Sequence, residues 1–462
     1  MVRSLVGDKA FYKRVYAIML PLMIQTLVTN SVNMLDNIMV GQVGTEAMNA
    51  VSIGSQLFTL YSFLVFGANA GAGIFSAQFV GAGNNEGVRY TFRYKMYISM
   101  GMAVVVASLF AFCGGPLASM YLQGDGDPAM AQRTLEEATK YLAILAVGLL
   151  PYAGSCAYSG ILRETGKATV PMVASISAVL TNLVGNYVLI FGNFGAPALG
   201  VMGAAISTAA SRFVEFGIMA FWTHLNLDKN EFARGAYRSF YIPKQLLLQI
   251  SAKGMPLLCN EFLFSSAAAV INQSYSTCGL DVLAAMTIAT TVQGLALVSY
   301  AGIGSATGII LGQEIGAGKE KAEVMATNVK LHAMAAGLAA AAGVVLASVA
   351  GLFPLMYNTS DAIRSLATKL ILVEALSLPF GAFGMAAYFC IRSGGKVLRT
   401  VLYDGGSKWI FGAALVFILS RFTAITIMPL YIIGQFVYNV CRDVVAVMMM
   451  RKGDWIQNLV KQ

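Results

Sequence analysis

One phrase occurs twice in this chain, first as Gln78-Phe-Val-Gly-Ala-Gly83 and again as Gln313-Glu-Ile-Gly-Ala-Gly318. In the register that places Gln78 over Gln313, 15 of the 63 positions between residues 21 and 83 are identical without a gap, which is more than shared hydrophobicity usually gives. A later match, in a slightly different register, pairs Arg163 with Arg392. The chain therefore contains two copies of one unit, and this repeat decides the fold.

The composition indicates that both copies lie in a membrane. Of 462 residues, 57% are hydrophobic and only 11% are charged, a balance too apolar for a water-soluble protein. Twelve helices of about 22 residues would use nearly the whole apolar total, and each would be long enough to cross a bilayer. Apolar stretches predict spans at about 15–40, 47–79, 96–113, 138–161, 169–191, 200–224, 246–275, 282–312, 330–355, 366–391, 400–420 and 424–449.

We therefore predict an all-α polytopic membrane protein with twelve transmembrane helices in two six-helix repeats. Because six is an even number, both copies enter the membrane from the same side and the repeats are parallel. Residues 1–225 are expected to form an N-lobe with helices 1 to 6, residues 226–245 a cytoplasmic linker, and residues 246–462 a C-lobe with helices 7 to 12. Two homologous halves can enclose a central cavity that opens to either side of the membrane in turn.

The basic residues indicate the orientation of the chain. Of the 31 lysine and arginine residues, 23 fall on the side of the N-terminus. The opposite loops contain only Arg133, Lys140, Arg364, Lys369 and Arg421. Loops rich in lysine and arginine stay in the cytoplasm, so both termini are expected there, in a multi-pass protein of the cell (inner) membrane. The net charge of +9 is then an orientation signal, and no nucleic-acid partner is expected.

The small numbers of histidines and cysteines exclude several kinds of catalytic and metal site. The chain has only two histidines, and its six cysteines form no CxxC pair, so neither a histidine-based triad nor a cysteine zinc site can be assembled. The segment from Gly312 to Lys319 has five residues between its outer glycines where a P-loop needs four. We expect no enzyme, no cofactor and no ATP-driven motor. The expected partners are small-molecule substrates and membrane lipid, and the expected state is a monomer.

A polar stripe runs along the first predicted span, because steps of three and four residues place its members on one helix face. The stripe contains Thr26, Thr29, Asn30, Asn33, Asp36 and Asn37. Lipid cannot satisfy such groups, so this face must meet protein or water. A carboxylate at this depth costs about 2.5–3.5 kcal/mol, which favours a functional role for Asp36. The alternative is that Asp36 lies close enough to the outer surface to be solvated.

Asn182 and Asn186 are one turn apart in the fifth span, and Thr208 follows in the sixth. Amide and hydroxyl oxygens of this kind can complete a cation site around a carboxylate. We predict that these three residues and Asp36 form a cation-coupling site, in which Asp36 binds a proton or a sodium ion. Asn and Thr in membrane helices also serve as ordinary interhelical hydrogen-bonding groups, and this alternative stays open.

Glu261, in the inner half of the seventh span, shares a helix face with Ser265 and Asn272, and the repeat places no acid opposite it. We predict that these residues, with Asn33, line the substrate cavity, where a negative charge would favour cationic ligands. The alternative is a structural ion pair between Glu261 and Lys253.

Three more charged residues fall within predicted spans. Glu374 lies in the tenth span, and Arg212 and Glu215 are near neighbours in the sixth. For Arg212 and Glu215 an interfacial or helix-packing role is the favoured interpretation.

Together these features resemble the multidrug and toxic compound extrusion (MATE) transporters over essentially the whole chain. The phrase from Asp36 to Gly44 is similar to the acid and glycine phrase that closes the family's first span. Residues 78–83 and 313–318 resemble its paired markers at the ends of spans two and eight, and residues 391–396 resemble its basic glycine phrase after span ten. The resemblance implies two six-helix lobes that export organic cations or other amphipathic compounds in exchange for a proton or a sodium ion.

The resemblance also implies roles for single residues. In many members of the family the N-lobe cation site joins a first-span acid to an Asn and an Asp one turn apart in the fifth span, and to a sixth-span Thr. Asp36, Asn182 and Thr208 match this pattern, whereas Asn186 stands where the second acid is expected. Pro21 matches the family's first-span kink, and a proline is a sensible hinge because it frees a carbonyl and bends the helix axis.

The sequence thus predicts secondary active efflux of amphipathic, cationic small molecules in exchange for H+ or Na+, by alternating access. A lipid-linked oligosaccharide flippase of the same superfamily is the alternative within transport, and it would be expected to have a strongly cationic cavity. A membrane-embedded transferase that uses Asp36 or Glu261 as a base is a further alternative. It would need a second convergent carboxylate or a metal-binding loop.

Overall fold

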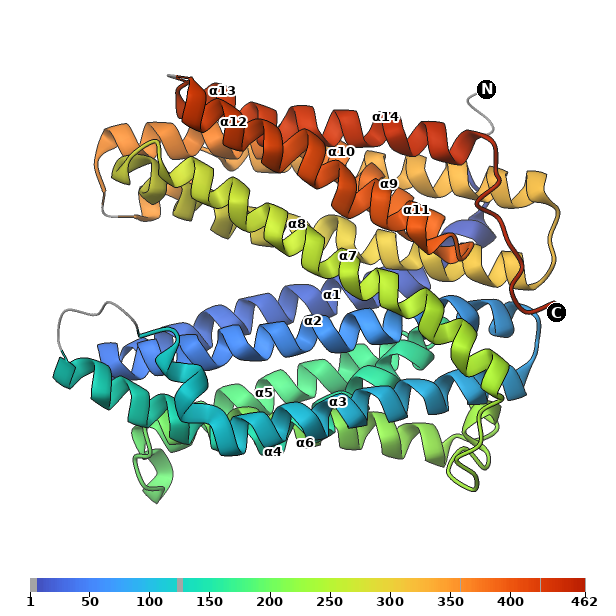
Figure 1. Ribbon diagram of the computed structural model, residues 1–462, viewed down its shortest axis with the longest axis horizontal. Helices are drawn as coiled ribbons and strands as arrows, with labels where there is room; N and C mark the ends of the chain where they lie inside the picture. The colour runs from blue at the N-terminus through green and yellow to red at the C-terminus, as the bar shows by residue number, and fades with distance from the viewer. Residues whose placement is uncertain (1–5, 123–127, 358, 424, 462) are drawn as a thin grey trace. The chain divides into compact units, whose positions relative to one another are not determined.

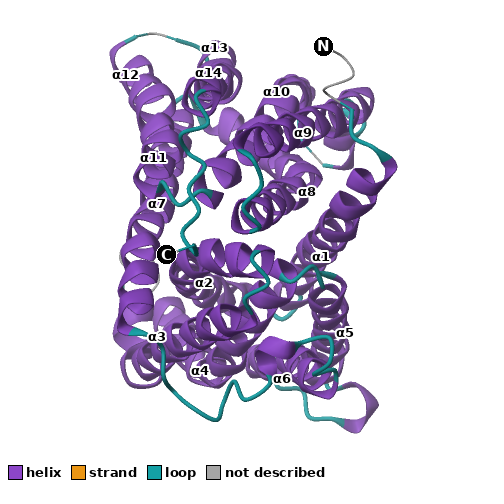
Figure 2. Ribbon diagram, turned by 90° about the vertical axis from the view of Figure 1, so that its right-hand side faces the viewer, coloured by secondary structure: helices purple, strands orange, loops and turns teal. Residues whose placement is uncertain are grey.

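The computed structural model describes residues 6–122, 128–357, 359–423 and 425–461, and these residues form helices joined by turns and loops, with no strand among them (Figure 1; Figure 2). Ten long helices come first in the chain. They are α1 (Lys9–Gly41), α2 (Thr45–Gly81), α3 (Asn85–Ser119), α4 (Pro128–Glu164), α5 (Thr169–Phe191), α6 (Val201–Leu225), α7 (Lys244–Ser276), α8 (Leu280–Gly316), α9 (Lys321–Val349) and α10 (Asp361–Ser393).

Two further rods are each assembled from shorter segments. The eleventh consists of α11 (Val397–Val401), the π-helical segments η5 (Leu402–Gly406) and η6 (Lys408–Ala414), and α12 (Leu415–Phe422). The twelfth consists of α13 (Ile427–Ile432), the π-helical η7 (Ile433–Val437) and α14 (Tyr438–Arg451). Short 3₁₀ turns lie in three connections, at η2 (Asn193–Gly195), η3 (Glu231–Ala233) and η4 (Phe353–Met356).

Ten of the described rods are long and apolar enough to cross a membrane, and α1 and α8 complete the twelve. The predicted all-α class with twelve helices is therefore confirmed. Most helices extend beyond the apolar stretches, and α3 begins at Asn85 rather than near residue 96. The added part of α3 contains a paired charge, because Lys95 is buried and its Nζ lies 2.6 and 2.5 Å from the carboxylate oxygens of Glu164 on α4.

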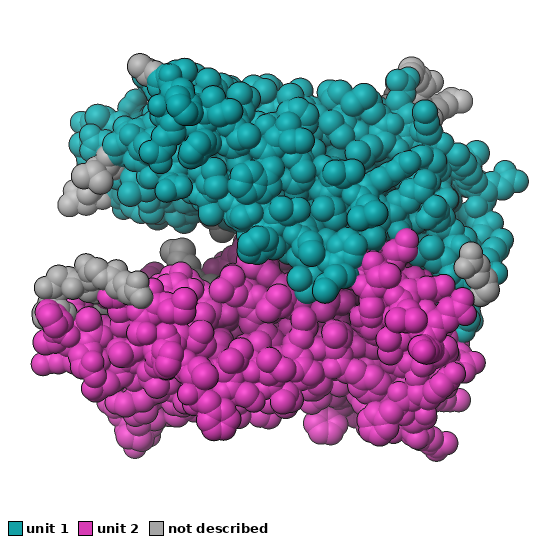
Figure 3. All heavy atoms as spheres, in the orientation of Figure 1, with its two compact units in different colours: residues 1–23, 77–84, 255–462 teal, residues 24–76, 85–254 magenta. Residues whose placement is uncertain are grey.

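The chain divides into two compact units, which Figure 3 colours separately. Unit 1 contains residues 1–23, 77–84 and 255–462, and unit 2 contains residues 24–76 and 85–254. Among the described residues, one hydrophobic core lies in unit 2 and two lie in unit 1. The division into an N-lobe of residues 1–225 and a C-lobe of residues 246–462 stays a prediction.

The chain passes from one unit to the other within α1, after Met23, and within α7, after Gly254. Each of these steps lies within two residues of a proline inside the helix, Pro21 in α1 and Pro256 in α7. A proline in a helix removes one backbone hydrogen bond and bends the axis. The predicted hinge at Pro21 therefore has a counterpart of the same kind in the second repeat.

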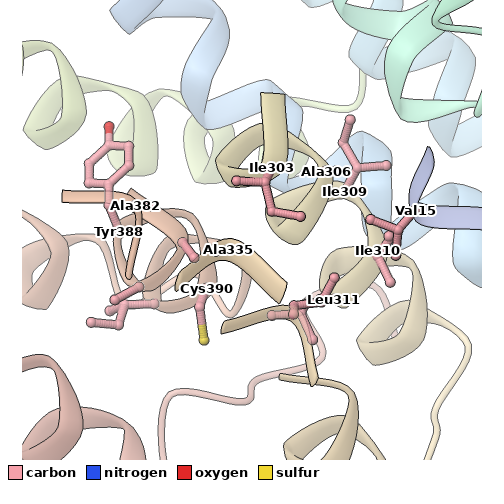
Figure 4. Packing of buried hydrophobic residues seen from close by; sticks show 14 of the residues in the cluster. Val15, Ile303, Ala306, Ile309, Ile310, Leu311, Ala335, Ala382, Tyr388 and Cys390 are labelled. Carbon is pink, nitrogen blue, oxygen red and sulfur yellow. The ribbon is translucent and has the colours of Figure 1, made fainter. Parts of the chain in front are cut away.

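The larger core of unit 1 is formed mainly by α8, α9 and α10, with the first part of α1 and buried residues of η5, α14 and the segment after it. Figure 4 labels Ile303, Ala306, Ile309, Ile310 and Leu311 of α8, Ala335 of α9, Ala382, Tyr388 and Cys390 of α10, and Val15 of α1. The end of α2 also packs in this unit. A Cβ added to Gly81 would overlap the backbone of Gln313, and one added to Gly316 would overlap the backbone of Gln78. The repeated phrase thus forms a reciprocal helix crossing that requires glycine on both sides.

The linker between α6 and α7 is held against α3 within unit 2. Arg93 is buried and donates to the carbonyl oxygens of Gly235, Ala236 and Tyr241 at 3.0, 2.8 and 2.8 Å. Because hydrogen bonds from a charged donor are strong, each contributes about 1.5–3 kcal/mol. The linker is therefore a folded part of this unit rather than a loose tether.

Candidate functional site

The predicted cation-coupling residues meet in unit 2, where α1, α5 and α6 come together. Asn186 Nδ2 donates to Asp36 Oδ1 at 2.8 Å. With the Asn182 amide oriented to satisfy its neighbours, its Nδ2 donates to Asp36 Oδ2 and Oδ1 at 2.8 and 2.9 Å, and Thr208 Oγ1 donates to its Oδ1 at 3.2 Å. Two amides from successive turns of α5 thus hold the carboxylate of Asp36. The structure brings these four residues together, and their role in coupling stays a prediction.

Two glycines explain how α5 and α6 come close enough to form this cluster. A Cβ on Gly185 would lie 2.8 Å from Ser207 Oγ, and one on Gly203 would lie 2.5 Å from the carbonyl oxygen of Leu189. Larger residues at these positions would push the two helices apart. Gly185 directly precedes Asn186, so the close packing of the helices also sets the position of the amide that binds Asp36.

Asn186 is 1% exposed, and its Oδ1 has no hydrogen-bond partner among the described residues. A buried polar atom without a hydrogen-bond partner lowers the free energy of unfolding by about 1–3 kcal/mol. It marks a place that can accept a cation or a donor hydrogen. With the oxygens of Asp36, Asn182 and Thr208, it offers the kind of oxygen ligands that hard cations bind. With the amide oxygens turned toward Asp36, the residues fit a sodium ion. With the amides as they are, the residues fit a proton on Asp36.

The predicted substrate-cavity residues are less closely grouped. The side chain of Asn33 lies outside the described part of the structure. Glu261 accepts a hydrogen bond from Tyr388 Oη at 3.3 Å within unit 1. On the same helix Ser265 is partly buried and Asn272 is exposed, and the described residues show no hydrogen bond between either of them and Glu261. Their role in a substrate cavity stays a prediction.

Asp404 is an acid of unit 1 that the sequence patterns did not single out. Asn260 Nδ2 donates to its Oδ2 at 2.9 Å, while the N–H of Gly405 donates to Asn260 Oδ1 at 3.0 Å. Asn260, the residue before Glu261 on α7, thus joins that helix to an acid of the eleventh rod. Asp404 lies in the π-helical segment η5, a form common at functional sites. The Gly-Gly pair that follows Asp404 resembles a helix end in the sequence, so Asp404 was not recognised as a residue inside a helix.

Glu374, which the sequence placed in the tenth span, also lies in unit 1 and is 4% exposed. Its Oε1 accepts hydrogen bonds from Gln293 Nε2 at 2.9 Å and from Tyr431 Oη at 2.6 Å. Two donors on one carboxylate oxygen tie α8, α10 and α13 together inside the unit. This arrangement gives Glu374 a packing role between helices.

A second polar group of unit 2 lies on α1, α4, α5 and α6, and we call it the inner layer. It consists of Gln25, Arg163, Ser175, Arg212 and Glu215. Arg163 Nη2 donates to Gln25 Oε1 at 2.8 Å, and Gln25 Nε2 donates to Ser175 Oγ at 2.6 Å. Ser175 Oγ donates to Glu215 Oε1 at 2.5 Å, and Arg212 Nη1 lies 3.4 Å from Glu215 Oε2. Arg212 and Glu215, expected to pack helices, are thus parts of a connected network.

Arg212 also contacts aromatic rings. Its Cζ lies 5.3 Å from the centroid of Phe58 and 5.1 Å from that of Tyr152, within cation–π range. Its Nε has no hydrogen-bond partner among the described residues. The guanidinium is therefore held by rings and by one carboxylate oxygen, which is a looser arrangement than the two short contacts between Lys95 and Glu164.

Two cavities open on the described part of unit 2. One, of about 690 Å³, is lined by a polar face of α2 together with apolar and aromatic residues: Val40, Met48, Asn49, Val51, Ser52, Ser55, Gln56, Thr59, Leu60 and Tyr121. The spacing of Asn49, Ser52, Gln56 and Thr59 is a helical period that the sequence could have shown. The other cavity, of about 660 Å³, includes Glu46, Arg133, Glu136 and Glu137 in its lining.

The comparisons with known proteins agree with this architecture. The family model MatE matches residues 21–188 and 256–418, one stretch in each repeat. The probable multidrug resistance protein NorM of Thermotoga maritima is 22% identical over 97% of this chain and 94% of its own. NorM of Neisseria meningitidis is 26% identical over 84% and 82%, and multidrug resistance protein MdtK of Edwardsiella ictaluri is 25% identical over 78% and 77%.

Solved structures show the same fold. A multidrug resistance MATE family transporter of the MOP superfamily, in an outward-facing conformation, superposes with a TM-score of 0.83 at 21% identity over 98% of both chains. A MATE transporter of Vibrio cholerae has a TM-score of 0.84 at 15% identity over 97% and 98%. The twelve-helix arrangement of this chain fits that fold. Since the family model covers most of the sequence, the chain belongs to the MatE family and is a multi-pass membrane transporter rather than an enzyme.

Proposed function

We propose that this protein is a secondary active multidrug exporter, which exchanges amphipathic, cationic small molecules for H+ or Na+ by alternating access. The observation that carries the proposal is the Asp36 cluster, a carboxylate held by Asn182 and Asn186 within a membrane-spanning unit. The relatives named multidrug resistance proteins support the class of substrate.

The cluster can couple two movements because one carboxylate can serve two cations in turn. An ionised Asp36 at low dielectric attracts any cation that enters unit 2, whether drug or coupling ion. A proton or a sodium ion on Asp36 neutralises the carboxylate and removes this attraction, which favours release of a cationic drug. While no cation is bound, the N–H groups of Asn182 and Asn186 stabilise the anion.

The cavities of unit 2 support cationic amphipathic substrates. One combines the polar face of α2 with aromatic and aliphatic residues, as an amphipathic ligand needs. The other contains Glu46, Glu136 and Glu137 against one arginine, Arg133. An acidic lining attracts cations, and it is the opposite of the strongly cationic cavity expected for a lipid-linked oligosaccharide flippase.

The same proposal includes the cell setting. The bias of 23 basic residues against five supports an inner-membrane protein with both termini in the cytoplasm. Lipid and small-molecule substrates are then the partners, and the working form is a monomer.

Efflux of a fluorescent cationic dye from proteoliposomes tests the proposal, with proton and sodium gradients imposed separately. One of the two gradients should drive the dye uphill, and Asp36→Asn should abolish this transport because an amide neither binds a proton nor lends a full charge to sodium. Asp228→Asn is the matched control, since the side chain of Asp228 is 94% exposed in the linker. Equal transport by the Asp36 variant and the wild type, at equal incorporation, would refute the proposal.

A further inference from the structure

The linker between α6 and α7 has a buried side and an exposed side (Figure 1). On the buried side Ala236 is 1% exposed, and the ring of Phe232 lies 5.6 Å from that of Phe92 on α3. On the other side Phe240 is 81% exposed. Because three hydrogen bonds from Arg93 also hold the linker on α3, the outward position of Phe240 is part of the fold.

Two observations place Phe240 at the level where the chain enters the membrane. The centroid of its ring lies 5.8 Å from that of Tyr97 on α3, and the apolar stretch of α3 begins at about residue 96. Four residues after Phe240 the chain starts α7 at Lys244, and the apolar stretch of α7 begins at about residue 246. Large apolar side chains at this level insert between lipid headgroups. We therefore expect lipid, rather than water, around the ring of Phe240.

Basic side chains flank Phe240 in the chain. Arg238 lies two residues before it and Lys244 four residues after it, and both are exposed. Neither side chain forms an ion pair or a hydrogen bond with the part of the chain that the structure describes. We call Arg238, Phe240 and Lys244 the linker surface.

The acids of the linker have partners elsewhere. Asp228 forms an ion pair with Arg234, and Glu231 accepts a hydrogen bond from Asn85 of α3. Against these two acids, residues 226–244 contain four basic residues, Lys229, Arg234, Arg238 and Lys244. The linker surface therefore presents positive charge beside an exposed aromatic ring, and its complement is a ligand that is both anionic and apolar.

We propose that the linker surface is a binding site for an anionic phospholipid of the cytoplasmic leaflet. Arg238 and Lys244 bind the lipid phosphate, and the ring of Phe240 lies against the upper part of the acyl chains. Anionic lipids of that leaflet attract basic segments next to membrane spans. The bias of basic residues toward the linker side supports this leaflet. A free phosphate ion would gain nothing from the exposed ring.

Lipid binding to the purified full-length protein tests the proposal. The protein in a neutral detergent is titrated with phosphatidylglycerol or with phosphatidylcholine of the same acyl chains, and bound lipids are counted by native mass spectrometry. The wild type should bind one phosphatidylglycerol molecule about 25-fold more tightly than phosphatidylcholine, since each basic residue near the headgroup contributes about fivefold. Arg238→Gln and Lys244→Gln should each reduce this preference about fivefold, and the double variant should remove it.

Matched variants separate the parts of the site. Arg133→Gln combined with Lys140→Gln removes the same two charges from α4, where they pair with Glu46 and Glu137, and should keep the preference. Arg238→Lys keeps the charge and should keep most of it. Phe240→Ser should weaken the binding of both lipids by a similar factor, because it removes apolar contact but no charge. Thermal unfolding of each variant shows whether the protein is intact.

Four outcomes would overturn the proposal. The first is an equal lipid preference in the wild type and in the variant that lacks Arg238 and Lys244, and the second is an equal loss in the α4 control, which would show a general effect of net charge. The third is unchanged lipid binding by Phe240→Ser. The fourth is displacement of the lipid by glycerol 3-phosphate at similar concentrations, which would assign the surface to free phosphate. Because no transport is measured, none of these outcomes bears on the proposed efflux.

Discussion

Asn186 occupies the position at which the family pattern places a second acid, and its geometry shows what this exchange does. Two carboxylates within hydrogen-bond distance would have to share a proton, because like charges so close cannot both ionise. The amide of Asn186 instead donates to Asp36 at 2.8 Å. The cluster therefore holds the carboxylate of Asp36 by donated hydrogen bonds rather than by a proton shared with a second acid.

Asn186→Asp should restore the shared-proton arrangement. We expect the variant to fold, since the side chains have nearly the same size, and to change the dependence of dye efflux on external pH. The change follows because two adjacent carboxylates share a proton, which a carboxylate beside an amide does not. The measurement is the efflux rate against pH, with Asn193→Asp in a connection between α5 and α6 as control. An unchanged pH profile would argue that residue 186 takes no part in coupling.

The sequence predicted part of the site because part of it depends on helix periodicity. Asn182 and Asn186 share a face by their spacing, and Thr208 and Asp36 fit a known family pattern. Asp404 was missed because its partner Asn260 lies 144 residues away, and a contact between distant helices leaves no periodic signal. Glu215 was predicted to pack helices, and its hydrogen bond from Ser175 could not be seen in the sequence because Ser175 lies on a different helix, α5.

Among the elements, α2 ends in a hydrogen-bonded clamp. Gln78 is fully buried, and its Nε2 donates to the carbonyl oxygens of Ser393 and Gln457 at 2.9 and 3.0 Å, while its Oε1 accepts from the N–H of Leu459 at 2.8 Å. Trp455, also fully buried, packs in the same segment after α14. One side chain thus ties the end of α10 and the segment after α14 to the end of α2.

Gln78→Leu should release this segment. The leucine keeps the bulk but leaves buried carbonyl and N–H groups without partners, at about 1–3 kcal/mol each. We expect a lower unfolding temperature in detergent and faster protease cleavage after Arg451. The matched control is Gln457→Leu, the same chemical change at an exposed side chain. Equal behaviour of both variants would show that the clamp does not stabilise the segment.

Pro256 in α7 tests the hinge interpretation at the scale of a helix. Pro256→Ala restores the missing backbone hydrogen bond and should stiffen α7 where the chain passes between the units. We expect slower dye efflux with unchanged dye binding, because a hinge affects the conformational step and not the binding site. Pro197→Ala, in an exposed turn, is the control. Loss of dye binding in the Pro256 variant would indicate a local structural role instead.

At the scale of the whole molecule, the two halves keep some polar positions of the repeat and differ at others. Gln25 corresponds to Asn260 and Arg163 to Arg392, but the residue that corresponds to Asp36 in the second repeat is Ile271, which is buried in an apolar core of unit 1. The Asp36 cluster therefore has no copy in the second repeat. The acids of unit 1 are then available for packing, as at Glu374, or for contact with substrate, as predicted for Glu261.

The orientation of the molecule follows from its charge pattern and can be measured without any transport. In a variant that lacks the six native cysteines, single cysteines at Phe194 and Phe240 place thiols at strongly exposed positions, 89% and 81%, in the α5–α6 connection and in the linker. With 23 basic residues on the linker side, an impermeant maleimide should label position 194 in intact cells and position 240 only after the membrane is opened. The reverse labelling would invert the topology and, with it, the direction in which a proton bound to Asp36 must travel.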